Sequence, residues 1–281
     1  MIRLSFSTSR TALALAAIVL VPSASAFGDI IADWNFGTTT VVAAPDNSPA
    51  PTAGTGTLST LGMTNNYTYT QKAPNVGSTA SDDVLVTASA ADTSFSESTW
   101  RIRGASPGNG WNLAAPQYTQ GIEADVSTIG YTGILLSFDW YATNQGVRDL
   151  QVQYNTDITN PNGWTNEGSV LAAVPNDYYG ATSSGVTSPS IDLSGIPGAN
   201  NDPHFGIRLV SAYDPTYTGA GSPTYTSATL TAGNPVVYNN NSGNWRFDNI
   251  AISGTAVPEP ASLGLLAIGT LALIGRRRAK R

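Results

Sequence analysis

Residues 133–155 read GILLSFDWYATNQGVRDLQVQYN, and this stretch decides the fold. Apolar and polar residues alternate in both of its halves, which is the period of a half-buried strand. The residues that would face the core are Leu136, Phe138 and Trp140 in the first half and Leu150, Val152 and Tyr154 in the second. The link between the halves, residues 142–147, is short and polar and contains a glycine. The spacing therefore predicts two strands, 133–141 and 148–155, joined as an antiparallel hairpin.

The same alternation recurs along the rest of the chain. It predicts further strands at residues 29–36, 83–88, 99–103, 120–126, 188–193, 204–211 and 245–253. The connections are rich in Gly, Pro, Asn and Thr, and the longest are 212–244 and 37–62, which has room for one short strand. No stretch of the body has the period of an amphipathic helix. The sequence thus predicts an all-β fold, a single antiparallel β-sandwich of about ten strands, and the long connections favour a jelly-roll-like topology.

The last of these strands changes its apolar phase. Trp245 and Phe247 occupy odd positions, whereas Ile250 and Ile252 occupy even ones. Because side chains alternate between the two faces of a strand, either both faces are buried or a bulge lies near Asp248 and Asn249.

The first 26 residues have the features of a signal peptide. Arg3 and Arg10 provide a positive start, residues 11–21 are apolar, and Ala24-Ser25-Ala26 is a small-residue cleavage signal. A membrane span needs about 20 apolar residues, and this run is roughly half as long. We therefore expect signal peptidase to act here and the mature chain to begin at Phe27.

Residues 257–281 form a second addressing segment in three parts. The triplet Pro258-Glu259-Pro260 precedes an uncharged apolar run, residues 261–275. A basic tail, 276–281, follows, and its cations are Arg276, Arg277, Arg278, Lys280 and Arg281. The prolines separate the tail from the body, the apolar run predicts a membrane helix, and cations favour the cytoplasmic side. At 1.5 Å per residue the run spans about 22 Å, short of a hydrocarbon core of ~30 Å, which favours a transient membrane stay.

This order of parts resembles the PEP-CTERM sorting signal of bacteria that have exosortase systems. The resemblance implies export, insertion in the membrane during sorting, and processing by an exosortase-type enzyme. The protein would then reside at the cell surface or outside the cell. The alternative is a plain C-terminal membrane anchor.

The body, residues 27–256, is strongly acidic and has no cysteine. It carries six cationic and 18 acidic side chains, a net formal charge of −12. So few cations argue against a nucleic-acid partner, whose phosphates need Lys and Arg. The absence of cysteine excludes disulfides, thiolate metal sites and a cysteine nucleophile.

Several short segments of the body resemble jelly-roll carbohydrate-binding modules and sandwich domains of bacterial surface proteins. They include ADWNFG at 32–37, WRIRG at 100–104, LSFDW at 136–140 and WRFDNIAISG at 245–254. The resemblance implies a structural Ca²⁺ that joins the first and last strands, held by Asp248 with Asp29 or Asp33. Oxygen ligands and an acidic body suit calcium. The alternative is that Asp248 accepts backbone N–H groups within a bulge.

The six tryptophans divide by their positions in the predicted elements. Trp34, Trp140 and Trp245 have strand positions that predict burial in the core. Trp111 follows a glycine-rich loop and Trp164 follows Asn-Pro-Asn-Gly, so both are candidates for stacking on a sugar ring.

Enzymatic motifs are lacking in the sequence. His204 is the one histidine, no G-x-S-x-G nucleophile elbow occurs, and no pair of carboxylates stands out as a glycosidase needs. The sequence therefore predicts a non-enzymatic, exported surface or matrix protein with a structural or adhesive role. One alternative is a carbohydrate-binding module that retains exopolysaccharide, and another is a hydrolase with an unrecognised carboxylate pair.

Overall fold

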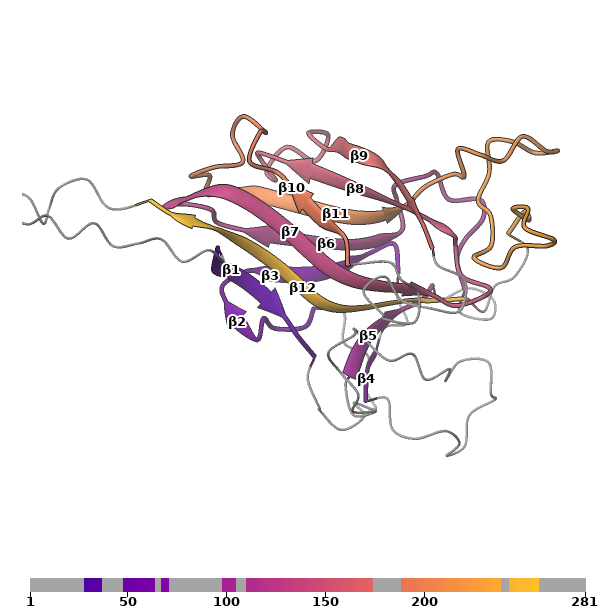
Figure 1. The fold of residues 1–281 in the computed structure, drawn as a ribbon, viewed down its shortest axis with the longest axis horizontal. Coiled ribbons are helices and arrows are strands. Elements are labelled where there is room, and N and C mark those ends of the chain that lie inside the picture. Colours follow the sequence, from indigo (N-terminus) through magenta and orange to yellow (C-terminus); the bar gives the residue numbers. More distant parts are fainter. Residues whose placement is uncertain are drawn as a thin grey trace, which may run out of the picture.

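The fold is an antiparallel β-sandwich. A computed structural model describes residues 28–36, 48–63, 67–70, 98–104, 110–173, 188–238 and 243–257. Within these ranges every regular element is a strand, and the strands form two antiparallel sheets packed face to face (Figure 1). The all-β sandwich predicted from the alternation is confirmed.

The larger sheet has seven strands. They are β1 (Asp29–Trp34), β2 (Ala53–Gly54), β4 (Tyr67–Thr70), β5 (Ser98–Ile102), β7 (Tyr131–Ala142), β10 (Ser190–Asp192) and β12 (Trp245–Ala256). Their order is β10-β7-β12-β1-β2, and β5 pairs with β12 and β4. Strand β12 is therefore central, since it pairs with β7, with β1 and with β5.

The second sheet has five strands in the order β3-β6-β11-β8-β9. They are β3 (Thr57–Leu61), β6 (Gly121–Val126), β8 (Asp149–Asn155), β9 (Thr165–Ala172) and β11 (Phe205–Ser211). The chain passes from one sheet to the other at most of its connections, as in a jelly roll.

The predicted hairpin is wrong, although both of its strands exist. Strand β7 pairs with β12 and β10 in the larger sheet, whereas β8 pairs with β11 and β9 in the smaller one. The link crosses the end of the sandwich, and its amides bond elsewhere: Thr143 N donates to Asn244 O and Arg148 N to Thr226 O. Alternation shows that a strand has one buried face but not which strand lies beside it. Here the two apolar faces meet across the core.

Aromatic residues fill the centre of the sandwich. The indole of Trp245 lies 5.2 Å from that of Trp140 and 4.4 Å from that of Trp111, measured between ring centroids. Trp34, Trp140 and Trp245 are fully buried, as predicted. Such ring pairs contribute about 0.5–1.5 kcal/mol each beyond the area that they bury.

A bulge in β12 resolves the change of phase. The pairing with β7 shifts register between Asp248 and Ala251, and Asn249 has a φ of 48°. The extra residue lets Phe247 and Ile250 both face the core. Of the two alternatives that the sequence left open, the bulge is present, and residues 245–248 are also buried on both faces.

Some predictions concern residues outside the described ranges. The strand predicted at 83–88, the signal peptide at 1–26, and the Pro-Glu-Pro triplet, apolar run and basic tail at 258–281 all lie there. In the part of the chain that the structure describes, no helix is long and apolar enough to cross a membrane.

Candidate functional site

The outer face of the five-stranded sheet carries a row of hydrogen-bonding side chains. Ser59, Glu123, Arg208, Gln153 and Asn166 are successive cross-strand partners on β3, β6, β11, β8 and β9. On β6, β11 and β8 the neighbouring residues along the strand point the other way, into the core. We call this row, together with Trp164 and Tyr118 beside it, the polar face.

Hydrogen bonds order the polar face before any ligand arrives. Arg208 donates from Nε and Nη2 to Glu123 Oε2, both at 2.6 Å. Gln153 Nε2 donates to Asn166 Oδ1 at 2.9 Å, and Asn166 Nδ2 donates to Tyr118 OH at 3.3 Å. The Arg208 and Glu123 side chains remain 18% and 20% exposed, so solvent and ligands can reach them.

Trp164 lies on the polar face, over Gly206. Its ring centroid is 3.8 Å from the guanidinium carbon of Arg208, a cation–π distance. A Cβ at position 206 would come within 2.9 Å of Trp164 Cη2 and 2.5 Å of Ile158 Cγ2. The missing side chain of Gly206 is therefore what lets the indole approach the sheet.

Trp111 does not belong to this face. It is 2% exposed and packs on Trp245 in the core, so the prediction that it contacts a glycan is corrected. Gly110 before it is also buried, and the backbone amide of Trp111 donates to Tyr238 OH at 3.2 Å. A glycine-rich loop in the sequence therefore did not mean an exposed tryptophan.

The polar face has a slight excess of negative charge. Burial, together with the nearby charge of Glu123, raises the pKa of Asp125 to about 6. Arg208 and a hydrogen bond from Thr57 act in the opposite direction. Two carboxylates thus face one guanidinium here.

Asp248 joins the last strand to the first. It is fully buried, and its Oδ1 accepts hydrogen bonds from Asn249 N at 2.8 Å and Phe36 N at 3.4 Å. Asp139 lies opposite on β7 and accepts from Asn249 Nδ2 at 2.8 Å and from Ser188 Oγ. Burial raises the pKa of Asp248 to about 7, and the charges of Asp139 and Asp33 add to this effect.

The described residues do not complete a calcium site around Asp248. Asp33 lies opposite Ala251, but Asp29 lies opposite Gly254, six residues beyond Asp248 on β12, so the pairing of Asp29 with Asp248 is corrected. Among the residues with described positions, no three His, Cys, Asp or Glu side chains gather as a metal site. Calcium takes six to eight oxygen ligands. Asp248 Oδ1 has the alternative role, since it accepts backbone N–H groups in the bulge. Calcium binding stays a prediction.

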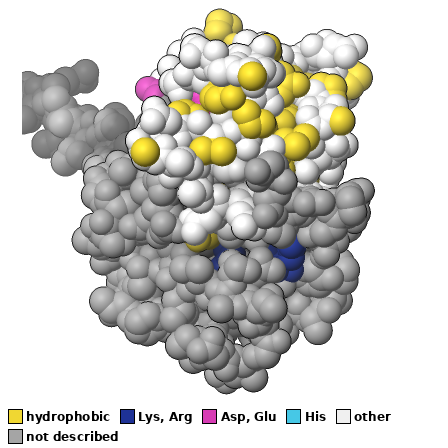
Figure 2. All heavy atoms as spheres, turned by 90° about the vertical axis from the view of Figure 1, so that its right-hand side faces the viewer, with side chains coloured by type: hydrophobic (Ala, Val, Ile, Leu, Met, Phe, Trp, Pro, Cys, Tyr) yellow, Lys and Arg dark blue, Asp and Glu magenta, His cyan; other side chains and the backbone are white. Residues whose placement is uncertain are grey.

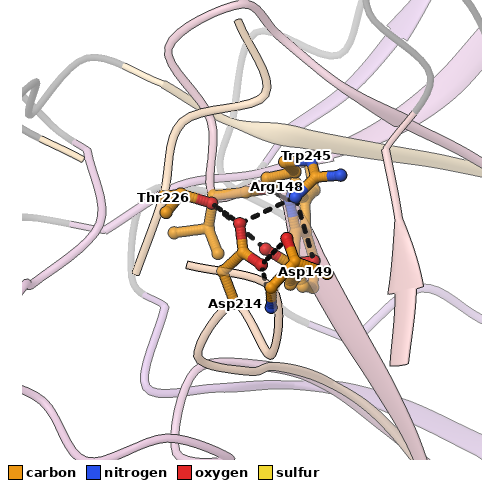
Figure 3. Close-up of polar contacts among 7 residues, drawn as sticks. Arg148, Asp149, Asp214, Thr226 and Trp245 are labelled. Atoms are coloured by element: carbon orange, nitrogen blue, oxygen red, sulfur yellow. Dashed lines mark hydrogen bonds and ion pairs between the residues drawn. The ribbon is translucent and has the colours of Figure 1, made fainter. Parts of the chain in front are cut away.

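A second carboxylate pair lies at one end of the sandwich (Figure 3). Arg148 Nη1 donates to Asp214 Oδ2 at 2.7 Å and lies 4.0 Å from Asp149 Oδ1. Thr226 Oγ1 lies 2.8 Å from Asp214 Oδ2 and 3.2 Å from Asp149 Oδ2. We call these four residues the end network; its carboxylates are 1% and 3% exposed, so a polymer cannot reach them.

The end network holds a long connection, residues 212–238, against β8. This connection, orange in Figure 1, extends from the end of the sandwich. Figure 2 faces that end, and its described surface shows mostly hydrophobic and uncharged side chains. The sequence did not single out Asp149 or Asp214, because nothing in the chain order brings positions 149, 214 and 226 together. His204 is exposed in a turn, where its amide donates to Asp202 Oδ1 at 2.8 Å.

Comparison with known proteins identifies the C-terminal segment. A profile of the PEP-CTERM protein-sorting motif matches residues 256–279. Residues 256–279 are a PEP-CTERM sorting motif. The motif implies an exported protein, membrane-associated sorting and processing by exosortase. No curated protein sequence matches the chain.

Several solved structures are similar to this chain at very low sequence identity. The CBM22-1 xylan-binding domain of Paenibacillus barcinonensis Xyn10C is 9% identical, with 84% of this chain and 100% of that one covered and a TM-score of 0.35. The K2 cleaved adhesin domain of Lys-gingipain is 10% identical, with coverage of 79% and 97% and a TM-score of 0.36. The N-terminal cellulose-binding domain of Cellulomonas fimi β-1,4-glucanase C is 10% identical, with coverage of 60% and 87% and a TM-score of 0.26.

Proposed function

We propose that this exported PEP-CTERM protein has a non-enzymatic, adhesive role and that its sandwich binds exopolysaccharide through the polar face. The observation that carries the proposal is the row of five hydrogen-bonding side chains across all strands of one sheet, with Trp164 and Tyr118 beside it. The row offers both donors and acceptors, which a chain of sugar hydroxyls needs.

The chemistry of the polar face favours a neutral glycan. Carbohydrate sites combine an aromatic surface with a few fixed polar groups, and both are present here. Arg208 is already paired with Glu123, and Asp125 adds a further carboxylate, so an acidic polymer would meet net repulsion. An exported protein would meet such a glycan outside the cell, as exopolysaccharide.

A binding role is also supported by how the carboxylates are engaged. Glu123 is held in an ion pair, and Asp149 and Asp214 are buried in the end network. A glycosidase needs two carboxyl groups that flank the bond to be cleaved. The ion pair of Glu123 and the burial of Asp149 and Asp214 therefore support a binding role over hydrolysis.

The proposal is tested by titrating the full-length protein with soluble xylan, hydroxyethyl cellulose and the acidic polymer alginate. We expect binding to at least one neutral polymer and weaker binding to alginate. Trp164→Ala should weaken neutral binding about tenfold, since stacking and packing at one aromatic contribute roughly 1–2 kcal/mol. Tyr217→Ala is the matched control, because Tyr217 is an aromatic residue of the 212–238 connection and lies outside the polar face. Unchanged affinity in Trp164→Ala, or no binding by the wild type, would overturn the proposal.

A further inference from the structure

Thr226 lies between two buried carboxylates but has one hydroxyl hydrogen to give (Figure 3). The contact with Asp214 Oδ2, at 2.8 Å, is shorter than the 3.2 Å contact with Asp149 Oδ2. If the hydrogen goes to Asp214, an ionised Asp149 would face the hydroxyl oxygen with no hydrogen between them. The second contact becomes a hydrogen bond when Asp149 is protonated and donates to Thr226 Oγ1.

Asp214 is the carboxylate that the surroundings keep ionised. Its Oδ1 accepts from Thr216 N at 2.7 Å and Thr216 Oγ1 at 2.6 Å, and its Oδ2 accepts from Arg148 Nη1 at 2.7 Å. Burial acts to raise the pKa of Asp214, but the hydrogen bonds from Thr216 and Thr226, together with Arg148, lower it.

Asp149 has the opposite environment. Arg148 Nη1 is 4.0 Å from its Oδ1, too far for a hydrogen bond. The described charged groups that face Asp149 are Arg148 and Asp214; β9 places Ala172 opposite it, and Ala212 N donates to its backbone oxygen. Burial raises the pKa of Asp149 to about 7 and the charge of Asp214 adds to this effect, while Arg148 and Thr226 oppose it.

We propose that Asp149 holds a proton in the folded protein at mildly acidic pH, near pH 6, and that the end network is a pH-sensitive clasp for the 212–238 connection. The proton completes a chain from Asp149 through Thr226 to Asp214 and Arg148. Two backbone bonds lie beside this chain, from Arg148 N to Thr226 O and from Ala228 N to Gly146 O, both at 2.9 Å. When Asp149 ionises, two buried carboxylates share one guanidinium and one hydroxyl, and the connection loosens.

Infrared spectroscopy of the full-length protein tests the proton directly. We expect a protonated-carboxyl signal that is present at pH 6, titrates away by pH 9, and is missing from Asp149→Asn at every pH. Subtracting the variant spectrum from that of the wild type isolates Asp149 from the other buried carboxyl groups. Identical carboxyl signals in the two proteins would overturn the proposal.

Hydrogen exchange tests the clasp. Between pH 6 and 9 the amides of Arg148 and Ala228 should accelerate roughly tenfold more in the wild type than base catalysis of exchange explains, as expected for a local opening. Asp149→Asn cannot ionise and should show no such excess; an equal excess there would refute the clasp. Thr226→Ser keeps the hydroxyl and should behave as the wild type, whereas Thr226→Val should exchange quickly at both pH values. If Asp149→Asn does not fold, the Ser and Val pair and a wild-type titration with ¹³C-labelled aspartate decide the question.

Discussion

At the scale of single residues, Gly206 determines where Trp164 can lie. The indole edge and Ile158 occupy the space that a side chain at 206 would fill, with the nearest atom 2.5 Å from the position of a Cβ. The cation–π contact between Trp164 and Arg208 depends on this approach. The geometry of the polar face therefore depends on Gly206, a residue that has no side chain.

We predict that Gly206→Ala destabilises the protein by about 1–3 kcal/mol, because the added methyl group must displace Ile158 and Trp164. Chemical denaturation gives the loss of stability, and tryptophan fluorescence reports the shifted indole. Gly195→Ala is the matched control, since nothing lies within 4 Å of a Cβ at that position. Equal stability of the two variants would contradict the packing described for Trp164.

Trp164 and Trp111 also show how far a sequence predicts a binding residue. Both follow turn-forming residues, and both were candidates on that ground. One lies on the polar face, and the other fills the core beside Trp245. The difference arises from packing between segments distant in sequence, which local turn signals do not contain. The row from Ser59 to Asn166 was hidden for the same reason, because its members come from five separate strands.

At the scale of the elements, alternation predicted strands well where one face is buried. Strands β6, β7, β8, β11 and β12 have such a face, and each was predicted within a few residues. Strand β3 lies within the connection 37–62, for which the sequence allowed one short strand without placing it, and β9 was not predicted. Both are edge strands of the five-stranded sheet with few buried residues, so their sequences lack a clear apolar period. Which strands pair with one another depends on the topology and not on the local pattern. For this reason the expected hairpin between β7 and β8 was wrong.

The bulge of β12 links the last strand to the end of β1 through Asp248. We predict that Asp248→Asn at pH 8 melts at the same temperature as the wild type or higher. Asparagine keeps an oxygen for Asn249 N and Phe36 N and removes a buried charge beside Asp139. Asp248→Ala should lower stability by about 1–3 kcal/mol, because two amide donors lose their acceptor.

A chelator provides the control for a cation bound at Asp248. Melting temperature is measured by calorimetry with and without EDTA, in the wild type and in Asp248→Asn. If EDTA lowers the melting temperature of the wild type but not that of Asp248→Asn, a cation is bound at the carboxylate. This result would contradict the expectation for Asp248→Asn. The expectation holds if EDTA has no effect and the asparagine variant keeps its stability.

At the scale of the whole molecule, buried carboxyl groups give the acidic body an unusual response to pH. Asp149 has a folded-state pKa raised to about 7, so between about pH 4 and 7 the unfolded chain releases a proton that the folded protein keeps. The contribution of Asp149 to the free energy of unfolding is therefore fully present near pH 4 and is lost as pH rises to 7. The free energy of unfolding falls by up to about 1.4 kcal/mol for each pH unit in this range. Asp125, with a pKa of about 6, acts in the same direction but less strongly, because solvent screens it. The pKa of Asp214 is lowered, so this group changes the free energy of unfolding only below about pH 4.

We predict that the free energy of unfolding of the full-length protein declines between pH 4.5 and 7, where many proteins gain stability. Urea denaturation at half-unit pH steps measures the slope. In Asp149→Asn the decline should become shallower, since asparagine binds no proton in either state, and Asp248, whose pKa burial also raises to about 7, accounts for the remainder. Glu123→Gln, which alters a partly buried ion pair, should leave most of the decline. A wild-type stability that rises through this range would mean that Asp149 is ionised in the folded protein. The body would then hold its long connection with a second buried charge, which is the arrangement that the single hydroxyl hydrogen of Thr226 between two carboxylates argues against.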